Sequence, residues 1–333
     1  MSGCKTAVVT GVNGQDGSYL ADLLLSRGYR VIGLKRRSST INTNRVDHIY
    51  VGESVSPTQF KMHYYDLSDG SCVANLLAKY KPDEFYNLAA QSHVAVSFEV
   101  PEYTSDGIAG GTLKILEAIR NINPTTRYYQ ASSSEMFGDS TDHGTNGFTE
   151  TSKMLPVSPY AVAKLHAHHM TRVYREAYGI HASSGILFNH ESPRRGETFV
   201  TRKITMAAAR IKMGLQSKLM LGNLDAKRDW GFAGDYVEAM WMMLQQDKPS
   251  DYVIATGKTY TVREFLEVVF DYAGLGSYEK YVGIDPRLFR PNEVPFLLGD
   301  PSKAKSVLRW EPKTSMVELA KMMYDSDLAA LRK

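Results

Sequence analysis

Short apolar runs alternate with stretches of helical periodicity over the first half of the chain. Residues 6–10 predict a buried strand, the apolar spacing of residues 19–25 predicts a helix, and residues 30–34 predict a second strand. Glycines at positions 11, 14 and 17 separate the first strand from that helix. A strand, a glycine turn, a helix and a second strand together form a βαβ unit.

The same alternation continues to residue 188. Further strands are expected at 60–65, 84–88, 127–131 and 182–188, and helices at 73–79, 111–121 and 160–178. This order predicts an α/β fold with a Rossmann-type, doubly wound parallel sheet. After Asn189 the alternation of strands and helices becomes less regular, although residues 202–213 still predict a helix. We therefore expect a Rossmann domain over 1–188, to which the chain returns around 220–256. Residues 189–219 and 257–333 are expected to form a smaller, ligand-binding lobe.

Composition limits the class of protein. The chain has 333 residues, of which 43% are hydrophobic and 23% charged, as in ordinary soluble globular proteins. Its net charge of +3 gives little support for nucleic-acid binding. Only two cysteines are present, and neither an apolar signal region nor a bilayer-length apolar run occurs. These features predict a cytoplasmic protein.

The glycine turn is the first candidate binding site, and it contains Gly11, Asn13, Gly14, Gln15, Asp16 and Gly17. Glycines let the backbone approach a pyrophosphate, to which the following helix presents free N–H groups. The spacing G-x-x-G-x-x-G differs from the best-known dinucleotide fingerprint, and an ordinary tight turn is the alternative. The strand before it and the helix after it favour a dinucleotide cofactor.

The residues after the second strand bear on the choice of cofactor. An NAD-preferring site usually carries an acidic residue there, whereas this chain has Lys35, Arg36, Arg37 and Ser38. Cations suit a 2′-phosphate, so the sequence favours NADP; a solvated basic turn is the alternative. Asp66 and Leu67, and then Leu88, Ala89 and Ala90, follow two later strands, where open α/β sheets form their binding crevice. The alternative is that these residues serve only as loop or helix-cap residues.

Four residues carry the candidate chemistry: Ser133, Glu135, Tyr160 and Lys164. Tyr160 and Lys164 are four residues apart, so a helix places them on one face. A nearby cation favours the phenolate, and Tyr160 could then exchange a proton with a sugar hydroxyl. Glu135 could remove a second proton. A Tyr–Lys pair is common on helix surfaces and Glu135 could be a cap, but the four in this order favour catalysis.

The second half supplies polar residues for a ligand. Asn189, His190 and Arg195 are followed by Lys203, Arg228, Arg290 and Glu293. Arginines spread over a lobe suit bidentate contacts with a diphosphate, and Asn and Glu suit sugar hydroxyls and a nucleobase. Nucleic acid fits poorly, since these cations lie among Pro, Glu and Asp. No metal site is expected, because the His residues lack metal-ligand spacing.

Together these motifs resemble the extended short-chain dehydrogenase/reductases, and within them the GDP-mannose 4,6-dehydratase family. The similarity covers nearly the whole length and is most specific in residues 35–39, 42–50, 189–204 and 289–305. It implies an NADP-dependent lyase that acts on GDP-mannose, oxidises carbon 4, eliminates water across carbons 5 and 6, and re-reduces carbon 6. The product would be GDP-4-keto-6-deoxy-D-mannose, a precursor in GDP-fucose biosynthesis.

The resemblance also assigns roles. Catalysis falls on Ser133, Glu135, Tyr160 and Lys164, with Glu135 removing the carbon 5 proton and returning it to the leaving hydroxyl. The expected cofactor contacts are Gly11, Asn13, Gly14, Gln15, Asp16, Gly17, Arg36, Ser38, Asp66, Leu67, Leu88, Ala89, Ala90, Tyr160, Lys164, Asn189, His190 and Arg195. The expected substrate contacts are Ser92, Glu135, Asn189, Val200, Lys203, Gly222, Arg228, Arg290 and Glu293.

Two further expectations follow from relatives. Residues 42–50 match a segment that meets a neighbouring subunit near the cofactor, which implies a homo-oligomer, either a tetramer or a dimer. Three positions depart from the family pattern: Ser133 stands for Thr, Phe232 for His, and Gly234 for a bulkier residue. The residues at positions 232 and 234 are expected to affect individual contacts with the substrate rather than the reaction. A nucleotide-sugar 4-epimerase or 4-reductase, and a non-catalytic NADP-binding regulator, remain alternatives.

Overall fold

A central parallel sheet organises the molecule. The computed structural model describes residues 4–50, 56, 58–289, 292, 294 and 296–332. These residues form a seven-stranded sheet in the order β11-β6-β5-β4-β1-β2-β3, and every pairing in it is parallel. Its strands are β1 (Thr6–Thr10), β2 (Arg30–Lys35), β3 (Phe60–Tyr64), β4 (Glu84–Asn87), β5 (Arg127–Ser133), β6 (Ala182–Leu187) and β11 (Asp251–Ile254). The order reverses direction at β1, which confirms the predicted Rossmann-type sheet.

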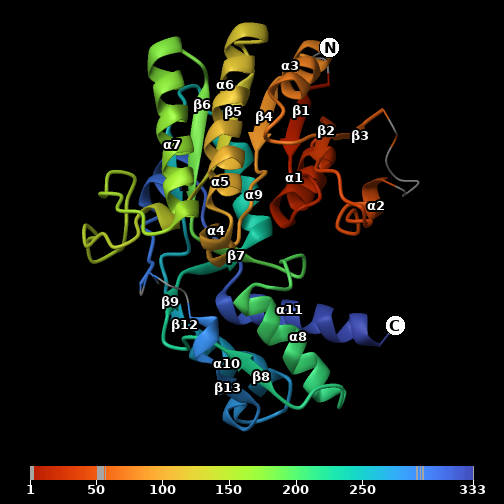
Figure 1. Ribbon diagram of the computed structural model, residues 1–333, viewed down its shortest axis with the longest axis vertical. Helices are drawn as coiled ribbons and strands as arrows, with labels where there is room; N and C mark the ends of the chain where they lie inside the picture. Colours follow the sequence, from red (N-terminus) through yellow and green to blue (C-terminus); the bar gives the residue numbers. More distant parts are fainter. Residues whose placement is uncertain are drawn as a thin grey trace.

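Helices cover both faces of this sheet (Figure 1). One face packs against α1 (Gln15–Ser26) and α9 (Ala233–Gln245), and the other against α3 (Gly70–Tyr80), α6 (Gly111–Ile122) and α7 (Pro159–Tyr178). In β1, Val9 joins the cluster under α1 and α9, whereas Val8 joins the cluster under α3 and α6. Because both faces are buried, the strands are continuously apolar, as the sequence pattern showed.

The glycine turn brings α1 close to the end of β1. Gly11 has φ of +65°, a conformation that glycine adopts without strain. A Cβ on Gly17 would lie 2.3 Å from the carbonyl oxygen of Gly11, so only glycine permits this approach. Gly14 is the N-cap of α1. The first N–H groups of the helix therefore point past the end of the sheet.

Helix α7 is delimited at both ends by local sequence. The hydroxyl of Ser158 accepts a hydrogen bond from Ala161 N, and Pro159 occupies the first turn. The helix ends at Gly179, which has φ of +67°. Its buried face includes Tyr160, Lys164 and His168, which recur every four residues.

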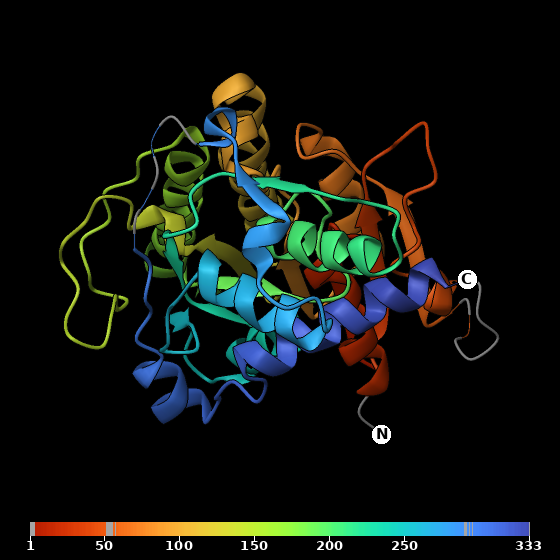
Figure 2. The ribbon, with the colours of Figure 1, turned by 90° about the horizontal axis from the view of Figure 1, so that it is seen from below.

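A smaller lobe lies beyond the carboxyl ends of the strands. It contains α8 (Val200–Lys212), α10 (Val262–Tyr272) and α11 (Met316–Leu331), which share an apolar cluster with Ile204, Phe265 and Leu319. Figure 2 shows these three helices lying across the end of the sheet. Short strands complete the lobe: β8 (Leu219–Leu221), β9 (Lys227–Arg228), β12 (Tyr260–Thr261) and β13 (Val282–Ile284), with β7 (Asn189–Glu191) paired to β10 (Trp230–Phe232).

The chain passes between the two parts more than once. It leaves the sheet after β6 and returns through α9 and β11, inside the interval 220–256. Trp310, much later in the chain, also packs into the cluster under α1 and α9 and donates from Nε1 to Asp235 O at 2.8 Å. No helix in the described part of the chain is long and apolar enough to cross a bilayer.

Candidate active site

A deep cleft of about 1060 Å³ lies where the sheet meets the lobe. The residues that follow β1, β2, β3, β4, β5 and β6 line one side of it, and the lobe lines the other. Pockets for one small ligand usually measure about 300–1,000 Å³. This cleft is large enough for an extended cofactor together with a second ligand.

The site residues predicted from sequence converge on this cleft. Among those in the described part of the chain, all but Ser38 line it. Ser38 lies in the irregular segment after β2, where its Oγ is 3.2 Å from Thr40 Oγ1. Arg290 and Glu293 fall outside the described residues. Residues separated by up to about two hundred positions in the chain thus share one cavity.

The basic run after β2 divides in two. Arg36 lines the cleft and donates to the hydroxyl of Tyr103 in α5 (Pro101–Ser105). Lys35 and Arg37 instead lie over the exposed ring of Tyr64, at 5.2 and 5.5 Å from its centroid. Of these three cations, Arg36 alone therefore lines the described cleft.

Asp16 and His190 connect the glycine turn to the lobe. His190 Nε2 is 2.8 Å from Asp16 Oδ2, and its Nδ1 is 2.8 Å from Phe188 O. Burial alone lowers the pKa of His190, but the Asp16 carboxylate outweighs it and leaves the pKa raised. Burial likewise opposes ionisation of Asp16, yet His190, with Gln15 and Arg195, brings its pKa down to about 2. Each side chain therefore favours the charged form of the other where the two line the cleft.

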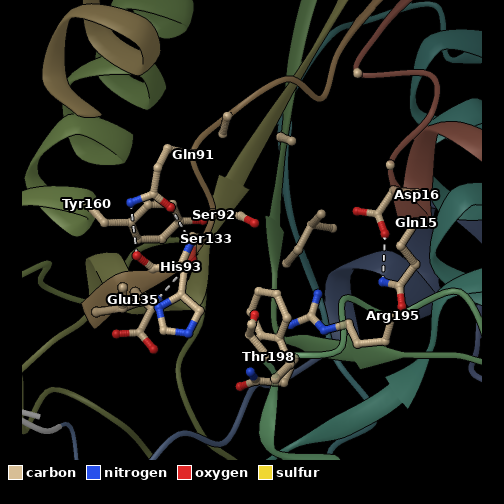
Figure 3. Close-up of a pocket in the computed structure, with 18 of the residues that line it drawn as sticks. Gln15, Asp16, Gln91, Ser92, His93, Ser133, Glu135, Tyr160, Arg195 and Thr198 are labelled. Atoms are coloured by element: carbon tan, nitrogen blue, oxygen red, sulfur yellow. Dashed lines mark hydrogen bonds between the residues drawn. The ribbon is translucent and has the colours of Figure 1, made fainter. Parts of the chain in front are cut away.

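The candidate catalytic residues come from two adjacent elements. Strand β5 ends at Ser133, and the 3₁₀ turn Ser134–Met136 that follows carries Glu135, whose backbone N donates to Ser133 Oγ at 3.3 Å. Helix α7 brings Tyr160 to the same place, where it hydrogen bonds with Ser133. Figure 3 shows Ser133, Glu135 and Tyr160 grouped at one end of the cleft, away from Gln15 and Asp16.

Lys164 is bonded to the backbone of β5 close to the Tyr160 ring. Its Nζ donates to the carbonyl oxygen of Ala131 at 2.8 Å and is 5.8 Å from the centroid of the Tyr160 ring. Burial lowers the pKa of Lys164 to about 8. The ammonium is thus anchored to β5, two residues before Ser133.

The pKa of Tyr160 differs from the sequence-based expectation. Proximity to Lys164 predicted a lowered pKa, whereas burial raises it to about 12, and the hydrogen bond from Ser133 opposes that rise only in part. The charge of Glu135 adds to the rise. In this environment the phenol keeps its proton at neutral pH. A further positive charge beside the ring is needed to make it a base.

The lobe contributes polar atoms to the opposite wall. Asn189 lines the cleft, and its Oδ1 is buried without a hydrogen-bond partner among the described residues. Arg228 is 6% exposed and also lines the cleft, as does Lys203 in the first turn of α8. At Gly222 a Cβ would lie 2.9 Å from Leu288 O, so glycine keeps this wall narrow. A buried arginine, a half-buried lysine and an orphan amide oxygen suit an anionic ligand with hydroxyl groups.

Comparison with known proteins identifies the family. A family model described as GDP-mannose 4,6 dehydratase matches residues 8–323. The chain belongs to the GDP-mannose 4,6-dehydratase family. It is 59% identical to GDP-mannose 4,6 dehydratase 1 of Arabidopsis thaliana over 329 residues, covering 97% of this chain and 90% of that protein. It is 53% identical to the GDP-mannose 4,6-dehydratase of Vibrio cholerae over 352 residues, covering 97% and 94%.

Solved structures give the same fold. The UDP-glucose 4-epimerase of Thermus thermophilus, in complex with NAD, is similar with a TM-score of 0.83 and 27% identity, over 98% of this chain and 99% of that chain. The family resemblance indicated by the sequence motifs is therefore confirmed, and so is the fold class. The similarity to an epimerase shows how one scaffold serves different nucleotide-sugar reactions.

Two departures from the dehydratase family pattern lie outside the cleft lining. The ring of Phe232 packs edge-on against Tyr19, with centroids 5.5 Å apart. A Cβ on Gly234 would lie 2.3 Å from Phe232 Cε1, so a side chain at 234 would compete with the Phe232 ring for space. Neither residue forms part of the described cleft wall.

Several cleft residues escaped sequence reasoning. Arg45 and His93 line the cleft, as do Tyr103, Phe199 and Asn223. Arg45 Nε donates to Arg194 O at 2.7 Å, which ties the loop after β2 to the lobe. No local pattern marks Arg45, Tyr103, Phe199 and Asn223, since each is a single polar or aromatic side chain in a loop or short helix. Only His93 had a sequence signal, because it follows the predicted strand-end residues 87–92.

Proposed function

We propose that this chain is an NADP-dependent GDP-mannose 4,6-dehydratase, which converts GDP-mannose to GDP-4-keto-6-deoxy-D-mannose with loss of water. One observation carries the proposal: a second potential base, Glu135, lies with Ser133 and Tyr160 at one end of a cleft that has room for two ligands. An alcohol dehydrogenase needs the phenol and the ammonium alone. Elimination of water requires the carboxylate as well.

The residues of the cleft fit NADP. The Gly11–Gly14–Gly17 turn presents the start of α1, Asp66 and Leu67 lie at the end of β3, and Arg36 supplies a cation that suits the 2′-phosphate. The orphan Oδ1 of Asn189 supplies a further acceptor in the cleft. When bound, the oxidised cofactor supplies a hydride acceptor and a positive charge, which can offset the burial that raises the pKa of Tyr160.

Tyr160, Ser133 and Lys164 act on the sugar 4-hydroxyl in this proposal. Tyr160 takes the hydroxyl proton, Ser133 donates a hydrogen bond to oxygen 4, and Lys164 stabilises the phenolate from its position on Ala131 O. Lys164 and Tyr160 are buried together on one face of α7. This arrangement excludes water from the proton that moves.

Glu135 acts on carbon 5. Once carbon 4 is a ketone, the proton on carbon 5 becomes acidic, and a carboxylate beside the sugar can remove it. Glu135 is 8% exposed, and the turn Ser134–Met136 holds it next to Ser133. A buried carboxylate at this point gives the site the base that a simple 4-reductase or 4-epimerase does not need.

The lobe is proposed to hold the GDP part of the substrate. Arg228 and Lys203 suit the diphosphate, Ser92 and Asn189 the sugar, and Val200 and Gly222 the walls around the nucleotide. Arg290 and Glu293 are proposed for the same lobe on sequence grounds. Charged and narrow walls of this kind favour an anionic, elongated ligand.

A single experiment tests the function. Purified protein with a catalytic amount of NADP is incubated with GDP-mannose and, in parallel, with dTDP-glucose. The masses of the products are then measured by mass spectrometry. We expect GDP-mannose alone to lose one water, with no net accumulation of NADPH. An isomeric sugar, or stoichiometric NADPH, would instead assign the protein to the epimerases or reductases.

We further propose a homo-oligomer, a tetramer or a dimer. Ile41 is 92% exposed and directly precedes the cleft-lining residue Asn42, as expected if a second subunit covers this loop near the cofactor. Light scattering of the NADP-bound protein measures the assembly, and a monomer would refute it. We place the enzyme in the cytoplasm, since Cys4 and Cys72 are both free thiols.

A further inference from the structure

Glu191 is a buried carboxylate to which the proposed reaction assigns no step. It is the last residue of β7, is 2% exposed and lines the cleft. A charge that is removed from water in this way requires partners. Its Oε2 accepts a hydrogen bond from Thr201 Oγ1, in the first turn of α8, and lies 3.0 Å from Arg195 Nε. The Glu191 carboxylate therefore connects both α8 and Arg195 to the end of β7.

Arg195 is constrained on several sides. Its backbone N donates to Ser192 O at 3.0 Å, which closes a turn after β7. Its Cζ lies 3.7 Å from the centroid of the Phe199 ring. Its buried Nε faces Glu191 as an ion pair, without a hydrogen-bond partner among the described residues. Because Nε and one face of the guanidinium are fixed, the fork of terminal nitrogens has a defined direction. Such a fork matches two oxygens of a phosphate group.

Arg195 lies between the two ends of the cleft. Figure 3 shows its side chain between the labelled residues of the catalytic end and those of the glycine turn. Burial acts to raise the pKa of both Asp16 and Tyr160, and the charge of Arg195 acts to lower both. The turn that carries Arg195 is also tied to the glycine turn, since Ser192 Oγ donates to Gln15 Oε1 at 2.9 Å. The cation is therefore close to the place where a dinucleotide has its diphosphate.

We propose that Glu191 is a positioning residue that orients Arg195 to bind a diphosphate in the cleft. This inference rests on the proposed function, in which both NADP and GDP-mannose carry a diphosphate. The connection of the Arg195 turn to Gln15 and the influence of Arg195 on Asp16 favour the diphosphate of the cofactor. Glu191 acts through the Arg195 guanidinium and exchanges no proton.

The direction of the change in affinity tests this role. Glu191→Gln keeps the size of the side chain and an oxygen for the Thr201 hydroxyl, but removes a negative charge near the bound anion. Electrostatics alone would then tighten the binding of a diphosphate. Loss of the orientation of Arg195 should instead weaken it. We expect the Kd values for NADP and NAD to rise together by about 10-fold, since a charged hydrogen bond contributes about 10–100-fold.

Calorimetric titration of the full chain with NADP and NAD measures these constants, and GDP is titrated into the NADP-saturated protein. The Kd for GDP should stay near wild type. A rise in the Kd for GDP in place of the cofactors would also support the positioning role and would assign Arg195 to the substrate diphosphate. Glu197→Gln, at an exposed position in the same segment, is the matched control and should bind all three ligands as wild type does.

Further variants separate positioning from a general loss of structure. Arg195→Met should raise the Kd for NADP by about 10–100-fold. Adding Glu191→Gln to it should then change the Kd by less than about twofold, because no guanidinium is left to orient. Glu191→Asp keeps the charge but withdraws it from Arg195, so it should also weaken both cofactors, and it provides the same test if Glu191→Gln is unstable.

Two results would overturn the proposal. One is unchanged or tighter binding of all three ligands by Glu191→Gln and Glu191→Asp. The other is a full additional loss of NADP affinity when Glu191→Gln is combined with Arg195→Met. Failure of the proposed function is observed separately, as a wild-type protein that binds NADP but releases no water from GDP-mannose.

Discussion

Ser132 Oγ lies 3.1 Å from His168 Nδ1, and both side chains are buried. Ser132 directly precedes Ser133 on β5, and His168 is one turn beyond Lys164 on α7. The contact therefore joins the two elements that carry the candidate catalytic residues. On its other side His168 Nε2 is 4.0 Å from Asp251, whose carboxylate forms two 2.8 Å bonds with Arg175.

This contact predicts acid sensitivity. Burial lowers the pKa of His168 from 6.5 to about 4; Asp251 opposes the shift, while His169, Arg175 and Arg172 reinforce it. The unfolded chain binds a proton below pH 6.5 and the folded protein does not, so acid favours unfolding. Between pH 6.5 and 4 the free energy of unfolding should fall by up to about 1.4 kcal/mol per pH unit more than in His168→Phe. Urea unfolding at pH 7.5, 6.5 and 5.5 measures how the free energy of unfolding depends on pH in the wild type and in His168→Phe. The same pH dependence in both proteins would contradict the prediction. His169→Asn is the control.

Arg36 and Arg37 are neighbours in sequence but should differ in effect. Arg36→Ala removes the cleft-facing cation, so the Kd for NADP should rise by about 10–100-fold, the loss of a charged hydrogen bond. The Kd for NAD should change by less than about threefold, since NAD has no 2′-phosphate. Arg37→Ala, which removes a cation lying over Tyr64, should leave both constants near wild type. Calorimetric titration with each cofactor measures these dissociation constants. An equal loss of affinity for NADP and NAD in Arg36→Ala would contradict the proposed contact of Arg36 with the 2′-phosphate.

Ser133 should tolerate threonine but not alanine. Its hydroxyl accepts from Glu135 N at 3.3 Å and hydrogen bonds with Tyr160. Threonine keeps that hydroxyl with a stiffer χ1, so Ser133→Thr should hold kcat within about threefold of wild type. Ser133→Ala should lower kcat by about 10–100-fold, which corresponds to about 1–3 kcal/mol. Steady-state water release from GDP-mannose measures both, and similar rates for the two variants would show that the hydroxyl is unimportant.

Glu135→Gln should separate oxidation from elimination. The amide keeps the size of the carboxylate but cannot accept the carbon 5 proton, so water release should fall by at least about 100-fold. The first hydride transfer needs Tyr160 and not Glu135, and a first-turnover rise in NADPH absorbance should remain. Rapid-mixing absorbance together with mass spectrometry provides both readouts. Full elimination by this variant would make Glu135 structural.

Gly234 and Phe232 should be coupled energetically. Alanine at 234 adds a Cβ 2.3 Å from Phe232 Cε1, which should destabilise the protein by about 1–3 kcal/mol despite better helix propensity. In a Phe232→Leu background that contact disappears. The same substitution should then stabilise by up to about 1 kcal/mol. A double-mutant cycle of thermal unfolding tests the change of sign, and additive effects would contradict the competition for one volume.

The sequence by itself determined the sheet and the position of the cleft. Apolar runs such as Thr6–Thr10 are buried on both faces, and this requirement is visible without any knowledge of partners. Ser158, Pro159 and Gly179 delimit α7 through local backbone chemistry. Residues at the ends of parallel strands must meet at one edge, so the candidate site residues could be assembled from their positions in the chain.

The tertiary structure alone decided which side chains face the cleft and how they ionise. Arg36 and Arg37 are equivalent in sequence, and only packing against Tyr103 and Tyr64 separates them. The pKa of Tyr160 rises where its spacing to Lys164 predicted a fall, because burial depends on strands and loops far along the chain. His93 and the Ser132–His168 contact left no periodic trace for the same reason. The apolar periodicity of the sequence indicates the secondary structure of the backbone. Desolvation and side-chain direction instead depend on every element that packs around the residue.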